Sequence, residues 1–144
     1  ISGMYGNGAV GLARLRRDGF ASLQGRFPGA SMTTRPLQFS GDRLFVNVGT
    51  VGSRLRVECL DMERRAIPGF SLEDCEGFVG NATRAEIRWK NDAGLGQLAG
   101  RPVRLRFQMD RGDLFSFWVS RWEDGRSGGH VAGGGPGFAG SRDL

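Results

Sequence analysis

The feature of this sequence that most constrains its fold is a strict alternation of apolar and polar side chains over short segments. The alternation is clearest in residues 103–109, where the apolar positions are Val103, Leu105, Phe107 and Met109. Successive side chains of a strand point to opposite faces of a sheet, so this pattern predicts a strand with one buried and one solvated face.

Other segments predict further strands by the same criterion. Residues 55–59 and 84–90 also alternate, and residues 44–48 form a further strand candidate after a Gly41-Asp42 turn, with residues 32–39 as its expected partner. Residues 114–119 are apolar on both phases, which predicts a central strand. Residues 12–16 and 20–23 flank Arg17-Asp18-Gly19, a hairpin signal.

A helical stripe is almost absent from the sequence. One short helical turn is expected around residues 95–99, which are closed by Gly100 and followed by Pro102. About eight short strands with turn signals between them predict an all-β fold, an antiparallel two-sheet β-sandwich of jelly-roll type.

Glycine divides the chain into parts. The sequence has 144 residues, enough for one domain, and 25 of them are glycine. Eight glycines lie at or after Gly125, where apolar residues are few. We therefore expect the sandwich in residues 11–122 and a glycine-rich C-terminal tail in 123–144, either flexible or laid over another surface. Because the chain begins with Ile1, it is expected to be a piece of a longer protein.

The charge is basic and is carried by arginine. The formal net charge is +5, and Lys90 is the single lysine among 20 basic residues. Arginines on the polar phases of the expected strands are candidates for binding a polyanion, unless Glu58 and Glu86 pair with them across strands. These candidates are Arg54, Arg56, Arg84, Arg88, Arg104 and Arg106. No nucleic-acid partner is expected, and no apolar stretch is long enough to span a membrane.

Two features favour a secreted or lysosomal protein. Cys59 and Cys75 flank a segment containing Pro68 and Gly69 that could fold back, which makes them a candidate disulfide. Asn81 begins an Asn-Ala-Thr sequon and is a candidate glycosylation site.

The residues offer little for catalysis. His130 is the only histidine and lies in the glycine-rich tail, so a Ser-His-Asp or Cys-His site is not expected. Histidines and cysteines together number three, and we expect neither a metal site nor a cofactor. Glu73 and Asp74 remain as carboxylates that could belong to a solvated loop, bind a hard cation or cleave a glycosidic bond.

Aromatic residues are candidates for stacking on a sugar. The alternation places Trp89 in the core, whereas Trp118 and Trp122 lie near the end of the last expected strand. Trp122 is the preferred stacking residue because it lies between charged neighbours. With Trp118, Glu73 and Asp74 it forms the set of carbohydrate-binding candidates.

An ordered set of segments resembles the C-terminal β-sandwich of proteins related to glycoside hydrolase family 32. These segments are residues 11–20, 33–37, 44–48, 55–58, 67–71, 102–107 and 113–118. The resemblance implies an upstream five-bladed β-propeller that carries the catalytic carboxylates, with residues 1–10 as its last strand or the linker. The chain departs from the family pattern at Gly49 and Phe115.

The resemblance gives the leading expectation for function. The chain would be a non-catalytic accessory sandwich of a secreted glycosidase-like protein, packed on the propeller and able to take part in oligomers. The alternative is an autonomous carbohydrate- or polyanion-binding module. A third possibility is an enzyme acting through Glu73 and Asp74.

Overall fold

A computed structural model describes residues 9–90, 93–129, 140 and 142–143. Within these residues the chain forms seven strands and one 3-10 turn. In order they are β1 (Leu23–Gly25), β2 (Ser31–Thr33), β3 (Arg43–Thr50), β4 (Arg56–Leu60), β5 (Asn81–Ile87), η2 (Leu95–Leu98), β6 (Arg104–Gln108) and β7 (Gly112–Ser120). The single expected helical turn is confirmed as η2.

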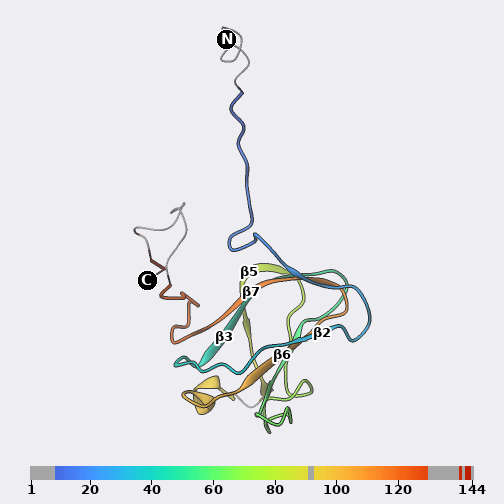
Figure 1. The fold of residues 1–144 in the computed structure, drawn as a ribbon, viewed down its shortest axis with the longest axis vertical. Helices are drawn as coiled ribbons and strands as arrows, with labels where there is room; N and C mark the ends of the chain where they lie inside the picture. Colours follow the sequence, from blue (N-terminus) through green and yellow to red (C-terminus); the bar gives the residue numbers. More distant parts are fainter. Residues whose placement is uncertain (1–8, 91–92, 130–139, 141, 144) are drawn as a thin grey trace.

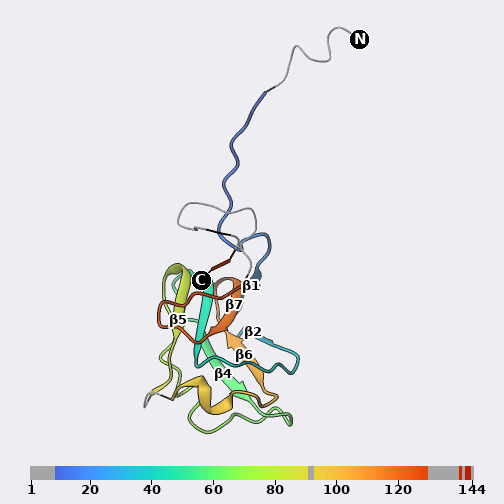
Figure 2. The same ribbon diagram turned by 90° about the vertical axis from the view of Figure 1, so that its left-hand side faces the viewer.

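The strands form two antiparallel sheets, as the alternation predicted (Figure 1, Figure 2). Sheet A has the strand order β1-β7-β3-β5, and sheet B has the order β2-β6-β4. The prediction of an all-β, two-sheet antiparallel sandwich is therefore confirmed.

The core lies between the sheets and is built from the apolar phase of each strand. Val57 and Cys59 of β4 and Leu105 of β6 are fully buried, and so are Leu44 and Val46 of β3. Burying one such aliphatic side chain contributes about 1.5–3 kcal/mol, so the alternation itself supplies the driving force for closing the sandwich.

The central position predicted for residues 114–119 is confirmed, because β7 lies between β1 and β3. Both of its faces are used. On the inner face Phe117 packs on Phe107 with 4.8 Å between ring centroids, and on the outer face Trp118 stacks on Phe45 at 5.9 Å. A strand apolar on both phases is stable only where both faces are covered.

One predicted pairing was wrong. Residues 32–39 pair with β6 in sheet B, not with residues 44–48, because β3 is already bonded by β5 and β7. Pro36 has no N–H to donate, and beyond Thr33 only one isolated bridge, between Leu37 and Val103, continues the pairing.

The hairpin predicted across residues 17–19 contains a turn but not two strands. Asp18 has a φ of 47°, and the Gly19 amide donates to the Arg16 carbonyl at 3.0 Å. Residues 12–16 join no sheet, because the side chain of Arg16 rather than its backbone makes the contacts with sheet A.

The neighbours of β3 each carry one extra residue near its middle. On β5 the register moves from Val46↔Ala85 to Val48↔Ala82, and on β7 Phe115 is the extra residue between two paired positions. Such bulges leave ladder groups of the backbone without their strand partners.

The first part of the glycine-rich tail lies on the outer face of sheet A. Gly125 is buried, and its carbonyl accepts a hydrogen bond from Trp118 Nε1 at 2.9 Å. Asp143 returns to this segment, where it exchanges backbone hydrogen bonds with Gly128 and Gly129. Residues 130–139, which include His130, and residues 1–8 of the expected linker lie outside the described residues.

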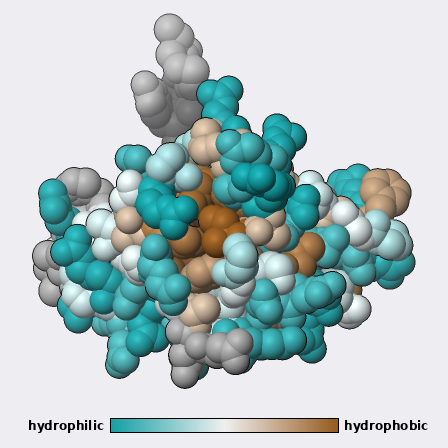
Figure 3. Space-filling model, turned by 90° about the horizontal axis from the view of Figure 1, so that it is seen from below, coloured by the Kyte–Doolittle hydropathy of each residue, from teal (hydrophilic) through white to brown (hydrophobic). Residues whose placement is uncertain are grey.

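On the face seen from below, Figure 3 shows one central apolar patch surrounded by hydrophilic side chains. Most of the surface on this side is therefore polar, as expected for strands whose outward phase carries arginine and glutamate.

The buried turn at Gly125 gives a test of the tail packing. Gly125 and Gly100 share a left-handed backbone, with φ of +70° and +73°, but an added Cβ would lie 2.5 Å from the Phe45 ring at Gly125 and meet nothing at Gly100. Gly100→Ala should lower the free energy of unfolding by about 1 kcal/mol, and Gly125→Ala by about 1–3 kcal/mol more. Urea unfolding measures both, and equal losses would show that the tail does not pack on Phe45.

Candidate functional site

The Arg16 guanidinium is the most heavily bonded side chain on the outer face of sheet A. Its Nε donates to Asn47 Oδ1 at 2.5 Å and its Nη1 to Asn81 Oδ1 at 2.5 Å. Its Nη2 donates to the carbonyls of Val48 at 3.2 Å and Ala82 at 2.6 Å. The same guanidinium lies 4.7 Å from the centre of the Phe115 ring. We call this set of contacts the Arg16 clamp.

The Arg16 clamp lies at the bulges described above. Val48 and Ala82 are paired residues beside the shift in register between β3 and β5, and their carbonyls receive the guanidinium N–H groups. Asn47 is fully buried, and its amide group also donates to the Arg17 carbonyl at 2.5 Å. The clamp therefore supplies hydrogen-bond partners to polar groups at the bulges. A buried polar group without a partner costs about 1–3 kcal/mol.

The segment attached to this clamp exposes apolar side chains. Before the clamp, Val10 and Leu12 are 105% and 86% exposed, and after it Phe20 is 84% exposed. Six of the nine large apolar side chains that the described residues expose lie between residues 10 and 27: Val10, Leu12, Leu15, Phe20, Leu23 and Phe27. We call residues 10–20 the apolar arm. The part of the arm before Arg16 extends away from the sandwich in Figures 1 and 2, whereas Arg16 is bonded to sheet A.

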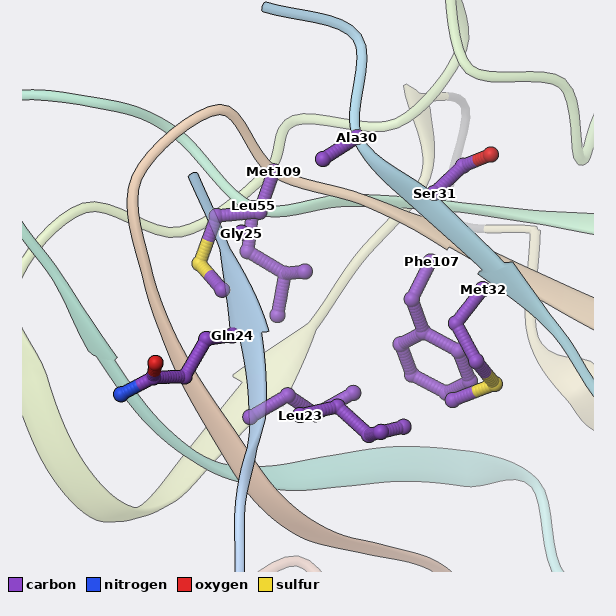
Figure 4. Close-up of a pocket in the computed structure, with 10 residues that line it drawn as sticks. Leu23, Gln24, Gly25, Ala30, Ser31, Met32, Leu55, Phe107 and Met109 are labelled. Atoms are coloured by element: carbon purple, nitrogen blue, oxygen red, sulfur yellow. The ribbon is translucent and has the colours of Figure 1, made fainter. Parts of the chain in front are cut away.

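An apolar opening leads into the core between the first two strands that follow this arm. A cavity of about 150 Å³ lies between the edge strands β1 and β2, and Leu23, Met32, Phe107 and Met109 line it (Figure 4). The sandwich is not sealed at this edge. Methionine side chains adapt their shape readily, so the opening suits an apolar group inserted from outside.

The arginines predicted to form one basic stripe are divided between two places. In sheet B, Arg56, Arg104 and Arg106 share the outer face, because they alternate with the core residues of β4 and β6. Arg106 forms an ion pair with Glu58, which is 3% exposed. We call this surface the basic face of sheet B.

The other predicted arginines lie elsewhere. Arg54 donates to the Glu76 carbonyl at 2.8 Å, and Arg88 pairs with Glu86 on β5 of sheet A. Arg84 is exposed on the same strand. The sequence left two arrangements open, and the molecule contains both. Ion pairs surround Glu86 on sheet A, and an arginine surface lies on sheet B.

The structure does not gather the carbohydrate-binding candidates into one site. Trp118 is stacked on Phe45 in sheet A. Trp122 has the guanidinium carbons of Arg121 and Arg126 over its ring, at 5.4 Å and 5.1 Å from the centroid. These cation–π contacts occupy ring surface that a sugar would need.

Glu73 and Asp74 lie in the loop between β4 and β5. Glu73 is exposed, while Asp74 accepts hydrogen bonds from the hydroxyl of Ser71 at 2.7 Å and from its amide at 3.2 Å. These bonds hold the pKa of Asp74 below its usual range. Asp74 thus stabilises the local turn, an arrangement that favours the ionised carboxylate over a general acid.

The predicted disulfide is not present. Cys59 and Cys75 are both free and buried. The Cys75 thiol instead accepts a hydrogen bond from the Val57 amide at 3.3 Å. Burial, with smaller contributions from Cys75 and Glu58, raises the pKa of Cys59 to about 12. The number of residues between the two cysteines allowed a bridge. A disulfide also needs a specific geometry of its Cα and Cβ atoms, which the sequence spacing does not determine.

Asn81, the candidate glycosylation site, is exposed at the start of β5. Its Oδ1 is held by Arg16.

A polar hollow of about 490 Å³ was missed from the sequence. Arg43 lies in its wall and donates to Glu86 at 2.9 Å and to Glu123 at 3.0 Å. Only the pairing of three separate segments brings these charges together, and no local pattern marks them. In the described part of the chain, no three side chains of metal-binding type are grouped, and no helix is long and apolar enough to cross a membrane.

Comparisons with protein-family models, curated proteins and solved structures gave no match to this chain. The resemblance to the family 32 sandwich therefore remains an expectation.

The Arg16 clamp predicts a large effect of a single substitution. Arg16→Met removes four hydrogen bonds and leaves polar groups of Asn47, Val48 and Ala82 without their donor. The free energy of unfolding should fall by about 2–4 kcal/mol. Arg14→Met is the matched control, because Arg14 is exposed, and should change stability by less than about 0.5 kcal/mol. Similar values for the two variants in urea unfolding would contradict the clamp.

The free cysteines predict a simple chemical result. Because both thiols are buried and burial raises the pKa of each, neither should react with a thiol reagent in the folded protein. Both should react in unfolded protein that has not been reduced. An absence of reactive thiols after unfolding would show that the disulfide forms.

Proposed function

We propose that this chain is a non-catalytic accessory β-sandwich that packs against a neighbouring domain of a secreted glycoside-hydrolase-like protein. The observation that carries the proposal is the concentration of exposed apolar side chains in and beside the apolar arm, including Val10, Leu12 and Phe20. Exposed apolar groups concentrated on one segment are typical of protein–protein contact surfaces.

The arm is attached firmly enough to transmit a contact to the sandwich. The Arg16 clamp fixes one point within it to β3 and β5, and Arg17 pairs with Asp143 at 3.0 Å. A domain that covers the arm would therefore be held against sheet A. Leu23, which is exposed shortly after the arm, also lines the cavity between β1 and β2.

Two further observations bear on the proposal. Glu73 and Asp74 line none of the hollows described above and belong to a turn, which fits a chain whose partner supplies any catalytic acids. The exposed sequon at Asn81 supports secretion, whereas the loss of the expected disulfide removes the other argument for it.

The test uses the full-length polypeptide with a protease site inserted between Gly8 and Ala9. After cleavage, the two parts should still elute together in size-exclusion chromatography. The triple variant Val10→Ser, Leu12→Ser, Phe20→Ser should separate them, because losing three apolar contacts weakens binding by about 100-fold or more.

The matched control removes three exposed apolar side chains outside the arm: Val51→Ser, Met62→Ser and Val79→Ser. This control should still elute as a complex. Cleaved wild-type parts that elute separately, or a control that separates as readily as the arm variant, would contradict the proposal.

A further inference from the structure

The outer face of sheet B carries a group of arginine side chains that take no part in the proposed docking. Along β6 the outward side chains are Arg104, Arg106 and Gln108, and in the register of the sheet Arg56 of β4 lies opposite Gln108. Side chains two positions apart on a strand are about 7 Å apart, and diagonal neighbours on adjacent strands are about 7–8 Å apart. The three arginines therefore form a row with regular spacing.

The charges in this row are unequally neutralised. Glu58 is the acidic side chain on this face of β4, and it is buried against Arg106, whose side chain remains 39% exposed. Arg104 donates Nη1 to the Thr34 carbonyl at 3.1 Å, while its Nε has no partner among the described residues. Arg56 is exposed and forms no ion pair within the described part of the chain. Three arginines against one carboxylate leave a net charge of +2.

We propose that the basic face of sheet B binds an anionic polysaccharide that carries sulfate or carboxylate groups, through Arg56, Arg104 and Arg106. The guanidinium group binds such oxyanions through paired N–H donors. An extended chain with charges at regular intervals matches a row of arginines better than a single compact anion does. This site does not depend on the docking proposal, because it lies on the other sheet.

The same face argues against a single-stranded nucleic acid. Proteins that bind such strands without sequence preference use aromatic side chains on which the bases stack. The outward residues of β2, β6 and β4 include no aromatic side chain. They are Ser31, Thr33, Arg104, Arg106, Gln108, Arg56, Glu58 and Leu60.

The experiment measures binding of the chain to heparin by titration calorimetry at several salt concentrations. The double variant Arg56→Gln, Arg104→Gln should weaken binding at low salt by about tenfold or more and reduce the dependence of affinity on salt. The matched control, Arg14→Gln with Arg84→Gln, removes the same charge from exposed positions outside sheet B. It should change affinity by less than about twofold.

Arg106 is left intact because it neutralises buried Glu58, and thermal unfolding checks that each variant folds. If the Arg104 substitution destabilises the chain, Arg56→Gln against Arg84→Gln gives the same comparison at positions without ion pairs. The proposal is overturned if wild-type chain does not bind heparin at low salt. It is also overturned if the control weakens binding as much as the double variant, or if a thymidine oligonucleotide binds more tightly than heparin.

Discussion

The Arg16 guanidinium holds together the outer face of sheet A, and the attachment of the apolar arm to the sandwich depends on that interaction. It reaches two strands at the level where both neighbours of β3 bulge, and it donates to carbonyls that the irregular ladder leaves available. The side chain of Asn47 is buried at this position, and its amide group donates a hydrogen bond to the Arg17 carbonyl. Arg16, a charged residue that the sequence pattern would place in solvent, thus has a structural role.

The two outer faces of the sandwich differ in what covers them. On the outer face of sheet A, two segments of the chain lie over the strands. The first is the clamp and turn at residues 16–19, and the second is the turn at Gly125, which lies over Phe45. On sheet B, Arg56 is exposed, and Arg104 is partly buried and donates to one backbone carbonyl. The first face favours attachment to another protein unit, and the second favours an ionic ligand.

Local alternation predicted the interior well because the two-residue period of a strand is a property of the backbone itself. The inward residues of β4 and β6 follow it, and the central place of β7 follows from its two apolar phases. Pairing could not be predicted in the same way. Whether residues 31–33 join β3 or β6 depends on which edges are already occupied, and that information is spread over the whole chain.

The candidate sites were predicted only in part, for a related reason. The phase of a strand placed Arg56, Arg104 and Arg106 on one solvated side, but it could not show that Arg88 belongs to the other sheet or that Arg16 turns inward. Trp118 and Trp122 were assigned to ligand stacking from their position near a strand end, whereas Phe45, Arg121 and Arg126 occupy their rings. Such contacts join segments that only the folded chain brings together.

The most direct measurement of the proposed docking is hydrogen–deuterium exchange of the apolar arm, in this chain alone and in a longer polypeptide that carries the proposed neighbouring domain. Residues 10–15 make no backbone hydrogen bonds to the sandwich, so their amides should exchange rapidly in the isolated chain. In the longer polypeptide, the proposed docking should slow exchange of these amides by at least about 100-fold, while the amides of β6 change little. Equally rapid exchange of residues 10–15 in both proteins would contradict the account.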